Sequence, residues 1–291
     1  MPRRGADLVA LVIFERIESL FGDPYYSRLV NGFADAVALR DTAFAMLMPQ
    51  GPGDAKRIVQ LAAGGKLDGV ALCAVPGSQP LAEQLASSGI PLVFAGRPAD
   101  PGRFTYVDVD QVGAAAHAVA HLVDGGRRTI ATITGRRGGS AGEDRLRGYL
   151  QGLEAAGLPA DSELIESGNF TREGGAHAMQ FLLRRRPQLD AVFVASDLMA
   201  LGALEILVQE GRRVPADVAV ASFDDHPFAV TLHPPLTSLR QPIEDQGREM
   251  VRLLLGLISA PAQPPRKVIL KSRLEVRGSS APAPGRVARA S

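Results

Sequence analysis

The sequence has few residues that cross-link a chain or hold a soft metal ion. Among its 291 residues Cys73 is the only cysteine, and there is no tryptophan. A single thiol excludes an internal disulfide and any thiolate cage for zinc. We therefore expect no metal and no other cofactor, and a reducing cytoplasm is the simplest location.

The sequence also lacks an excess of charge of one sign and any long apolar run. It carries 32 basic and 31 acidic residues, a net charge of +1, which is too balanced for a surface that coats DNA phosphates or anionic lipid. No apolar stretch approaches the roughly 20 residues that span a bilayer. Arg3 and Arg4 before the run 8–14 imitate a signal peptide, but Glu15 ends the run and no cleavage site follows. We expect no membrane contact, and any DNA contact to be made outside this chain.

The chain is rich in hydrophobic residues, which a large core needs. Its residues are 46% hydrophobic and only 5% aromatic, and its length suits two lobes or one large α/β unit. Short apolar runs alternate with helical segments, as in parallel strands covered by helices on both faces. The expected strands are 8–14, 42–48, 69–74, 92–95, 105–109, 129–134, 191–195, 218–223 and 267–276.

Several helix ends carry start and stop signals. Asp23 before Pro24 predicts a capped helix to about residue 40, Ser78 and Thr171 are further expected caps, and a helix is expected over 242–258. Glycines are expected to close other helices in the left-handed conformation. These glycines are Gly89, Gly125, Gly157 and Gly211.

The two halves of the chain resemble each other. The segments 67–70 and 189–192 share a Leu-Asp pair before an apolar strand, and they lie 122 residues apart, as Leu8 and Ile130 do. This repeat predicts two similar doubly wound parallel-sheet lobes, with a ligand cleft between them at the carboxyl ends of the strands and several chain crossovers. The expected N-terminal lobe is 7–109 plus 241–268, the expected C-terminal lobe is 112–237 plus 271–278, and 279–291 is expected to be a disordered tail.

Two patterns imitate catalytic or metal sites. His117 and His121 have the spacing of a shared metal, but Ala118 stands where a zinc protease has glutamate, and a helix-surface pair is the better interpretation. The run 138–142 fits G-x-S-x-G around Ser140, with Asp224 and then His226 or His233 downstream, yet it follows its strand too loosely for a nucleophile elbow. Neither a dinucleotide fingerprint nor a phosphate-binding lysine loop is present. We expect no enzyme, and keep a hydrolase using Ser140 as a minor alternative.

One set of motifs points to a single family. Each motif alone is weak, and their order and spacing together are specific. They are Asp23-Pro24-Tyr25-Tyr26, Val109-Asp110, Gly126-Arg127-Arg128, the run 145–149, Gly168-Asn169-Phe170, the run 195–203, the runs 214–218 and 222–225, the run 235–242, and Arg277-Gly278-Ser279-Ser280. Over residues 7–280 the chain resembles the effector-binding core of LacI/GalR-type transcription regulators.

This resemblance implies a function. The family's core has the fold of periplasmic sugar-binding proteins, forms homodimers, and changes how two attached helix-turn-helix headpieces bind operator DNA. Only residues 1–6 precede the first expected strand, so we expect a repressor core without its DNA-binding headpiece. A transporter's solute-binding protein shares the fold and stays an alternative.

The resemblance also names candidate ligand-binding residues. It implies that Arg145 and Asp224 hold the effector from the second lobe, that Phe170 is an aromatic platform, and that Tyr25 and Tyr26 contact the ligand from the first lobe. Aromatic faces and paired donor and acceptor groups suit a sugar, which we expect in preference to a purine. Weaker candidates are Arg97, Ser196 and Asp197, where Ser196 replaces an asparagine of some sugar-responsive members.

Each candidate has a purely structural alternative. Tyr26 is equally suited to core packing, and Asp197 is better explained as a helix N-cap. Arg145 and Asp224 could form an ion pair that only stabilises the fold, although we favour ligand contact.

Overall fold

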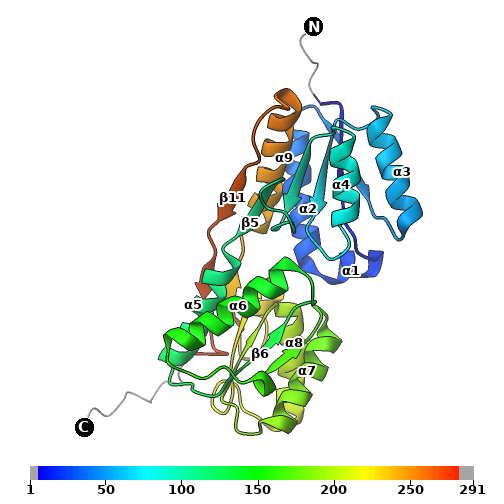
Figure 1. Ribbon diagram of the computed structural model, residues 1–291. Coiled ribbons are helices and arrows are strands. Elements are labelled where there is room, and N and C mark those ends of the chain that lie inside the picture. The colour runs from blue at the N-terminus through cyan, green and yellow to red at the C-terminus, as the bar shows by residue number, and fades with distance from the viewer. Residues whose placement is uncertain (1–5, 282–291) are drawn as a thin grey trace. The chain divides into compact units, whose positions relative to one another are not determined.

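The chain folds into two compact α/β units, seen in the computed structural model, which describes residues 6–281 (Figure 1). The first unit comprises residues 6–109 and Pro242–Leu270, and the second comprises Asp110–Gln241 and 271–281. The chain thus passes between the units after Val109, after Gln241 and after Leu270. Each unit is described below by itself.

The first unit is built on a six-stranded sheet in which every pairing is parallel. Its strand order is β11-β5-β4-β3-β1-β2. The strands are β1 (Leu8–Val12), β2 (Ala43–Leu47), β3 (Gly69–Cys73), β4 (Leu92–Ala95), β5 (Thr105–Val109) and β11 (Lys267–Leu270).

Helices cover both faces of this sheet because its strands are apolar on both sides. Val9 and Leu11 of β1 pack with α2 and α9, whereas Ala10 and Val12 pack with α3 and α4. All four strand residues are buried, as the near-continuous apolar run predicts. The helices are α1 (Ile17–Gly22), α2 (Pro24–Ala38), α3 (Pro52–Ala63), α4 (Gln79–Ser87) and α9 (Ile243–Ser259).

The second unit repeats this plan. Its sheet has the order β12-β10-β9-β8-β6-β7, and only the short β12 is antiparallel to its neighbour. No helix among residues 6–281 is long and apolar enough to cross a membrane. The elements are α5 (Gln111–Asp124), β6 (Ile130–Thr134), α6 (Ser140–Ala155), η1 (Ser162–Leu164), β7 (Ile165–Ser167), α7 (Arg172–Arg185), β8 (Ala191–Val194), α8 (Asp197–Gln209), β9 (Ala219–Asp224), η2 (Pro227–Val230), β10 (Thr237–Arg240) and β12 (Arg273–Glu275).

The repeated Leu-Asp pair has the same structural role in both units. The Asp68 carboxylate accepts hydrogen bonds from the backbone N–H groups of Asp7 and Leu8, at 2.8 and 2.9 Å. The Asp190 carboxylate accepts from the backbone N–H groups of Arg128 and Thr129 at 2.9 and 3.0 Å. Each aspartate, just before one central strand, therefore fixes the start of the neighbouring strand.

The structure corrects several expected boundaries. The strand expected over 267–276 is two strands, because the chain leaves β11 of the first sheet at Leu270 and joins the second sheet as β12. Ser78 does not cap α4, since its hydroxyl donates instead to the Val75 carbonyl oxygen at 2.8 Å. Gly126 rather than Gly125 has the positive φ, of 87°. The helix α1 and the short strands β7 and β10 are additional elements.

The predicted disordered tail is wrong at its start. Ser279 is fully buried, where its hydroxyl donates to the Val220 carbonyl oxygen at 2.6 Å and accepts from the Thr237 N–H at 2.8 Å. Ser280 is also buried and donates to the Thr237 hydroxyl at 2.7 Å. Apolar and small polar residues here pack onto the second sheet instead of entering solvent. Residues 282–291 of the expected tail lie outside the described part of the chain.

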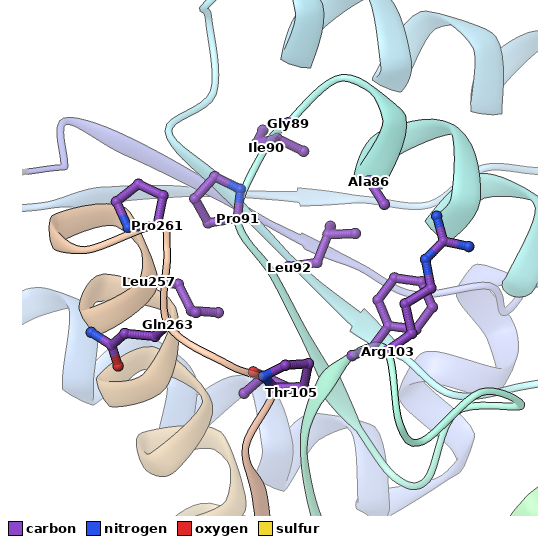
Figure 2. A pocket seen from close by; sticks show the side chains of 12 residues that line it. Ala86, Gly89, Ile90, Pro91, Leu92, Arg103, Thr105, Leu257, Pro261 and Gln263 are labelled. Atoms are coloured by element: carbon purple, nitrogen blue, oxygen red, sulfur yellow. The ribbon is translucent and has the colours of Figure 1, made fainter.

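A hollow of about 200 Å³ lies in the first unit (Figure 2). Leu92 and Thr105, the first residues of β4 and β5, line it together with residues of the loop after α9 such as Pro261. It therefore lies at the amino edge of the sheet. Open α/β sheets bind ligands at the carboxyl edge, so this hollow is not the candidate effector site.

Candidate functional site

The predicted ligand residues of the second unit lie at the carboxyl edge of its sheet. Phe170 follows β7, Ser196 and Asp197 follow β8, and Asp224 is the last residue of β9. Arg145 lies on α6, the helix that follows β6. The parallel strands bring side chains from distant parts of the sequence to one edge, where such sheets bind their ligands.

Arg145 and Asp224 form the centre of this group. Their side chains are 5% and 6% exposed, and Arg145 Nη1 lies 3.4 Å from Asp224 Oδ1. Nη1 also donates to the Ala195 carbonyl oxygen, and the guanidinium plane lies over the Phe223 ring, 3.8 Å from its centre. The hydrogen bonds of Arg145 to described residues leave its Nη2 nitrogen unused. Arg145 therefore has both a structural role and a donor available to a ligand.

Two glutamines hold this pair, and the sequence analysis named neither of them as a site residue. Gln111 Oε1 accepts from Arg145 Nε at 2.8 Å, and Gln241 Nε2 donates to Asp224 Oδ1 at 2.6 Å. Gln111 and Gln241 are 7% and 2% exposed. Gln241 lies in the motif 235–242, and Gln111 follows Asp110 just after a chain crossover, which are the two signals that the sequence offered.

Asp224 and Asp225 occupy unusual backbone conformations. Their φ angles are 109° and 52°, a region that residues other than glycine rarely adopt. The Asp225 N–H donates to the Ser238 hydroxyl at 3.0 Å, and its carboxylate accepts from Arg240 Nε at 2.6 Å and pairs with Arg277 Nη2 at 2.7 Å. These contacts hold the strained turn, which is the kind of conformation found at ligand sites.

Phe170 presents an aromatic ring at the same edge. Its backbone φ is 61°, and a Cβ atom on Gly135 would lie 2.0 Å from the ring, so the ring rests directly on the backbone at the end of β6. The Arg145 guanidinium lies 5.8 Å from the ring centre. An aromatic face next to a guanidinium suits the apolar face and the hydroxyls of a sugar ring.

Ser196 and Asp197 hold the start of α8 and the neighbouring strand ends together by hydrogen bonds. Ser196 is the N-cap of α8, and its hydroxyl accepts from the Met199 N–H at 3.3 Å, so the predicted cap at Asp197 is one residue out. Asp197 is fully buried and accepts from the hydroxyls of Ser222 and Ser238 at 2.5 and 2.6 Å and from the His226 N–H at 2.7 Å. Asp197 therefore links the start of α8 to β9, to β10 and to the turn after β9.

The environment of Asp197 makes its carboxyl group hard to ionise. Burial raises its pKa to about 7, and the nearby Asp224 carboxylate acts in the same direction, against His226 and the hydrogen bonds from Ser222 and Ser238. Because this pKa lies above the ordinary value of about 3.9, the folded chain holds a proton that the unfolded chain releases. Stability due to this group is therefore complete below about pH 4 and falls as the pH rises to 7.

Asp197→Asn is expected to remove this dependence. Between pH 4 and pH 7 the variant should lose roughly 1 to 3 kcal/mol less unfolding free energy than the wild type, since asparagine does not titrate. Urea unfolding at four pH values in that interval measures the slopes. The exposed substitution Glu210→Gln is the control, and equal slopes in all three chains would contradict the prediction.

Tyr25 and Tyr26 begin α2 in the first unit, capped by Asp23, whose carboxylate accepts from the Tyr25 N–H at 2.9 Å. Tyr25 is half-buried, and its hydroxyl donates to Gln246 Oε1 at 3.2 Å. Tyr26 is buried in the core of the unit, and its hydroxyl donates to Glu15 Oε1 at 3.2 Å. Burial raises the pKa of Tyr26 well above its usual value. Core packing thus accounts for Tyr26, whereas Tyr25 is only half-buried.

Arg97 lies two residues after β4, at the carboxyl edge of the first sheet. Its backbone N–H donates to Asp108 Oδ2 at 3.0 Å, and the residue is half-buried. The preceding Gly96 has a φ of 84°, which turns the chain sharply off the strand. Arg97 therefore lies at the carboxyl edge of the first sheet, the edge at which open α/β sheets bind ligands.

The structure does not support a catalytic site at Ser140 or a metal site at His117 and His121. Ser140 is the first residue of α6, and Asp224, the acid of the hydrolase alternative, already accepts a hydrogen bond from Gln241. Asp224 holds Arg145, and the His226 ring is fully buried with Nε2 at 3.7 Å from Asp224 Oδ2. His121 Nε2 lies 2.7 Å from the Ser280 hydroxyl. Within residues 6–281 no three histidine, cysteine or acidic side chains gather into a group that could hold a metal ion.

Comparisons of the sequence with known proteins agree on one family. A family model described as a periplasmic binding protein-like domain matches residues 119–280. The chain is 41% identical over 278 residues to the HTH-type transcriptional regulator CelR of Thermobifida fusca, a match that covers 95% of this chain and 82% of CelR. It is 31% identical over 267 residues to the HTH-type transcriptional repressor CytR of Escherichia coli K12, covering 89% and 76%.

Comparisons with solved structures give the same result. A complex of the transcriptional regulator CelR with cellobiose superposes with a TM-score of 0.90 at 41% identity, over 96% of this chain and 86% of the other. A LacI transcriptional regulator from Bacillus cereus superposes with a TM-score of 0.90 over 95% and 99% of the two chains. Its identity is 24%, so it supports the fold alone.

Proposed function

The chain belongs to the LacI family of transcriptional regulators, and from this we propose that it is the effector-sensing and dimerisation part of a sugar-responsive regulator. The observation that carries the proposal is the buried Arg145–Asp224 pair at the carboxyl edge of the second sheet, whose guanidinium carbon lies 5.8 Å from the centre of the Phe170 ring. A guanidinium donates to adjacent hydroxyls, a carboxylate accepts from them, and an aromatic ring packs on the C–H face of a pyranose. No catalytic step is needed for this role.

We propose a β-linked disaccharide of the cellobiose type as the effector. The relative whose complex contains cellobiose is 41% identical to this chain. Within the proposal, the sugar is bound from the second unit by Arg145, Asp224 and Phe170. Ser196 and Asp197 hold the carboxyl edge of the sheet in place by their hydrogen bonds. Tyr25, Tyr26 and Arg97 belong to the first unit's contribution, in which Tyr26 acts by supporting Tyr25, whose ring meets it edge-on at 5.3 Å.

Thermal unfolding against a ligand panel tests this proposal. The panel contains cellobiose, maltose, glucose, glucose 6-phosphate, adenosine and adenine. A ligand present at 100 times its Kd adds about 2.7 kcal/mol of stability, which moves the Tm by several degrees in a chain of this size. We expect cellobiose to give the largest rise, confirmed by calorimetric titration.

The panel also discriminates between effector classes. A response to adenosine or adenine alone would replace the sugar by a purine, which is the second candidate. A chain that responds to no member of the panel would contradict the proposal of a saccharide effector.

We further propose that the chain acts as a homodimer in the cytoplasm and represses transcription through a helix-turn-helix headpiece on operator DNA. Large apolar side chains on the surface of the first unit support dimerisation. Leu39, at the end of α2, is 83% exposed, and Met46, on the edge strand β2, is 40% exposed. Exposed apolar residues that gather at one edge commonly mark a protein interface.

Leu39→Asp combined with Met46→Asp is expected to turn the dimer into a monomer. Two carboxylates at the edge beside β2 would have to be desolvated in an apolar interface. Sedimentation equilibrium measures the dissociation constant, which we expect to rise at least about a hundredfold, or about 2.7 kcal/mol. Val208→Asp, at a residue 71% exposed on the second unit, is the comparison. A double variant that stays dimeric would place the interface elsewhere.

A further inference from the structure

Four buried side chains of the second unit form one hydrogen-bonded row. Gln111 Oε1 accepts from Arg145 Nε at 2.8 Å, Arg145 Nη1 lies 3.4 Å from Asp224 Oδ1, and Asp224 Oδ1 accepts from Gln241 Nε2 at 2.6 Å. All four residues are at most 7% exposed. The middle two are the residues that the proposed function gives to the effector.

The two ends of this row lie at chain crossovers. Gln111 is the second residue after the crossover at Val109 and follows Asp110, the N-cap of α5. Gln241 is the last residue before the crossover to Pro242. The row therefore joins two crossover segments that are 130 residues apart in sequence, and it does so through the effector pair.

Asp225 extends the arrangement toward the third crossover. Its carboxylate accepts from Arg240 Nε at 2.6 Å, and Arg240 Nη1 lies 3.5 Å from Glu275 Oε1 on β12, the strand that follows the crossover at Leu270. Because Asp224 and Asp225 are adjacent and both have positive φ, a rotation of this dipeptide moves both sets of contacts together.

The first unit contains a smaller counterpart. Gln246 on α9 accepts from the Tyr25 hydroxyl at 3.2 Å and donates to the Val107 carbonyl oxygen at 2.8 Å. Val107 lies just before the first crossover, and Gln246 lies just after the second. A candidate ligand residue is thus bonded to crossover segments in each unit.

We propose that Gln111 and Gln241 are positioning residues that tie the effector pair to the two crossover segments, so that effector occupancy and crossover conformation are energetically linked. The proposal rests on the proposed function in one respect, namely that Arg145 and Asp224 bind the effector. Linkage of this kind is reciprocal, because whatever stabilises one arrangement of the crossovers stabilises the arrangement of the pair that goes with it.

One amide accepts a hydrogen bond and the other donates one, so the same substitution should affect the two positions differently. Gln111 supplies an acceptor to Arg145, so Gln111→Glu keeps the acceptor and adds a charge complementary to the guanidinium. Gln241 supplies a donor to Asp224, so Gln241→Glu removes the donor and places two carboxylates together. Simple packing would make the two substitutions equivalent, since both change an amide to an acid of equal size.

The first measurement is cellobiose affinity by calorimetric titration. We expect Gln111→Met to lose at least about tenfold, Gln111→Glu to lose less than Gln111→Met because it keeps the acceptor for Arg145, and Gln241→Glu to lose at least about thirtyfold. Gln151→Glu on the exposed surface of α6 is the matched control and should change affinity less than twofold. Equal losses for Gln111→Glu and Gln241→Glu would overturn the proposal.

The second measurement uses no ligand. A double-mutant cycle of Gln111→Met and Gln241→Leu is followed by urea unfolding, and we expect the two substitutions to be non-additive by at least about threefold in the unfolding equilibrium constant. The coupling should disappear when the cycle is repeated with Arg145→Lys, which keeps the charge and loses the fork of donors. Additive effects in the wild-type background would overturn the proposal.

The two measurements separate the proposals from each other. If the ligand-free coupling is present and depends on Arg145 but no sugar binds, the positioning role stands and the proposed function fails. If cellobiose binds but the coupling is absent, the proposed function stands and the positioning role fails.

Discussion

Arg145→Ala is expected to lower the affinity for cellobiose by at least about thirtyfold, which corresponds to about 2 kcal/mol. The substitution removes the unused Nη2 donor and also the contact that holds Asp224 in place. The loss should be larger than one hydrogen bond is worth, because the remaining carboxylate is left without its cation in a buried setting.

The same substitution is expected to cost about 2 to 4 kcal/mol of unfolding free energy. Arg145 Nη1 bonds the Ala195 carbonyl oxygen after β8, and Nε bonds Gln111 at the start of α5, so both segments lose a partner in addition to Asp224. Asp224 would also keep its negative charge near the buried Asp197 without the balancing charge of Arg145, and the carboxylate of Asp224 already raises the pKa of Asp197.

Arg145→Lys is the control that separates charge from geometry. It retains the positive charge beside Asp224, so stability should recover in part, whereas a lysine ammonium cannot reproduce the planar fork and affinity should stay at least about tenfold below the wild type. Titrations are made well below the Tm of each variant. An Arg145→Ala chain that folds and binds cellobiose as tightly as the wild type would contradict the site.

The sequence predicted the bounds of some strands from their apolar runs and the start of one helix from its capping residue. The strands 92–95 and 105–109 agree residue for residue, and the helix at Asp23-Pro24 begins where its cap predicts. The strand 267–276 could not be divided from its sequence, because the break at Leu270 reflects a change of sheet and not a change of hydrophobicity. Local pattern does not encode which of two sheets a strand joins.

The sequence predicted the site less completely. The resemblance named Arg145, Phe170 and Asp224 as ligand residues, and the structure places all three at one edge of the second sheet, while their contact with a ligand stays a prediction. Gln111 and Gln241 were missed, since their roles depend on partners 34 and 17 residues away. Spacing along the chain carries no information about such pairs until the fold has brought them together.

Small residues make the closest helix contacts in both units. Gly148 of α6 faces the Val112 carbonyl on α5, and Gly202 of α8 faces the Arg172 carbonyl on α7. A Cβ atom at these positions would lie 2.3 and 2.0 Å from the carbonyl oxygens. In the first unit Gly32 of α2 faces Glu244 of α9 in the same way. Each helix pair thus packs backbone against backbone, which fixes the distance between its two axes.

Gly32→Ala is therefore expected to destabilise the chain by at least about 3 kcal/mol. Its Cβ would lie 2.0 Å from the Glu244 carbonyl oxygen, and backbone atoms cannot move aside as a flexible side chain can. Moving α9 outward would open the core that Leu29 and Phe33 of α2 share with Met250 and Leu254. Urea unfolding gives the change in free energy, and the m-value reports whether the chain still unfolds in one step.

Gly256→Ala is the matched control because Gly256 also lies in a helix of the first unit but has nothing within 4 Å of its added Cβ atom. Alanine favours the helix over glycine by about 0.5 to 1 kcal/mol, so this variant should be slightly more stable than the wild type. The two substitutions add the same methyl group and are expected to change stability in opposite directions. A Gly32→Ala chain as stable as the Gly256→Ala chain would show that α2 and α9 are not held at backbone contact, and the first sheet would then need another explanation for the close cover on that face.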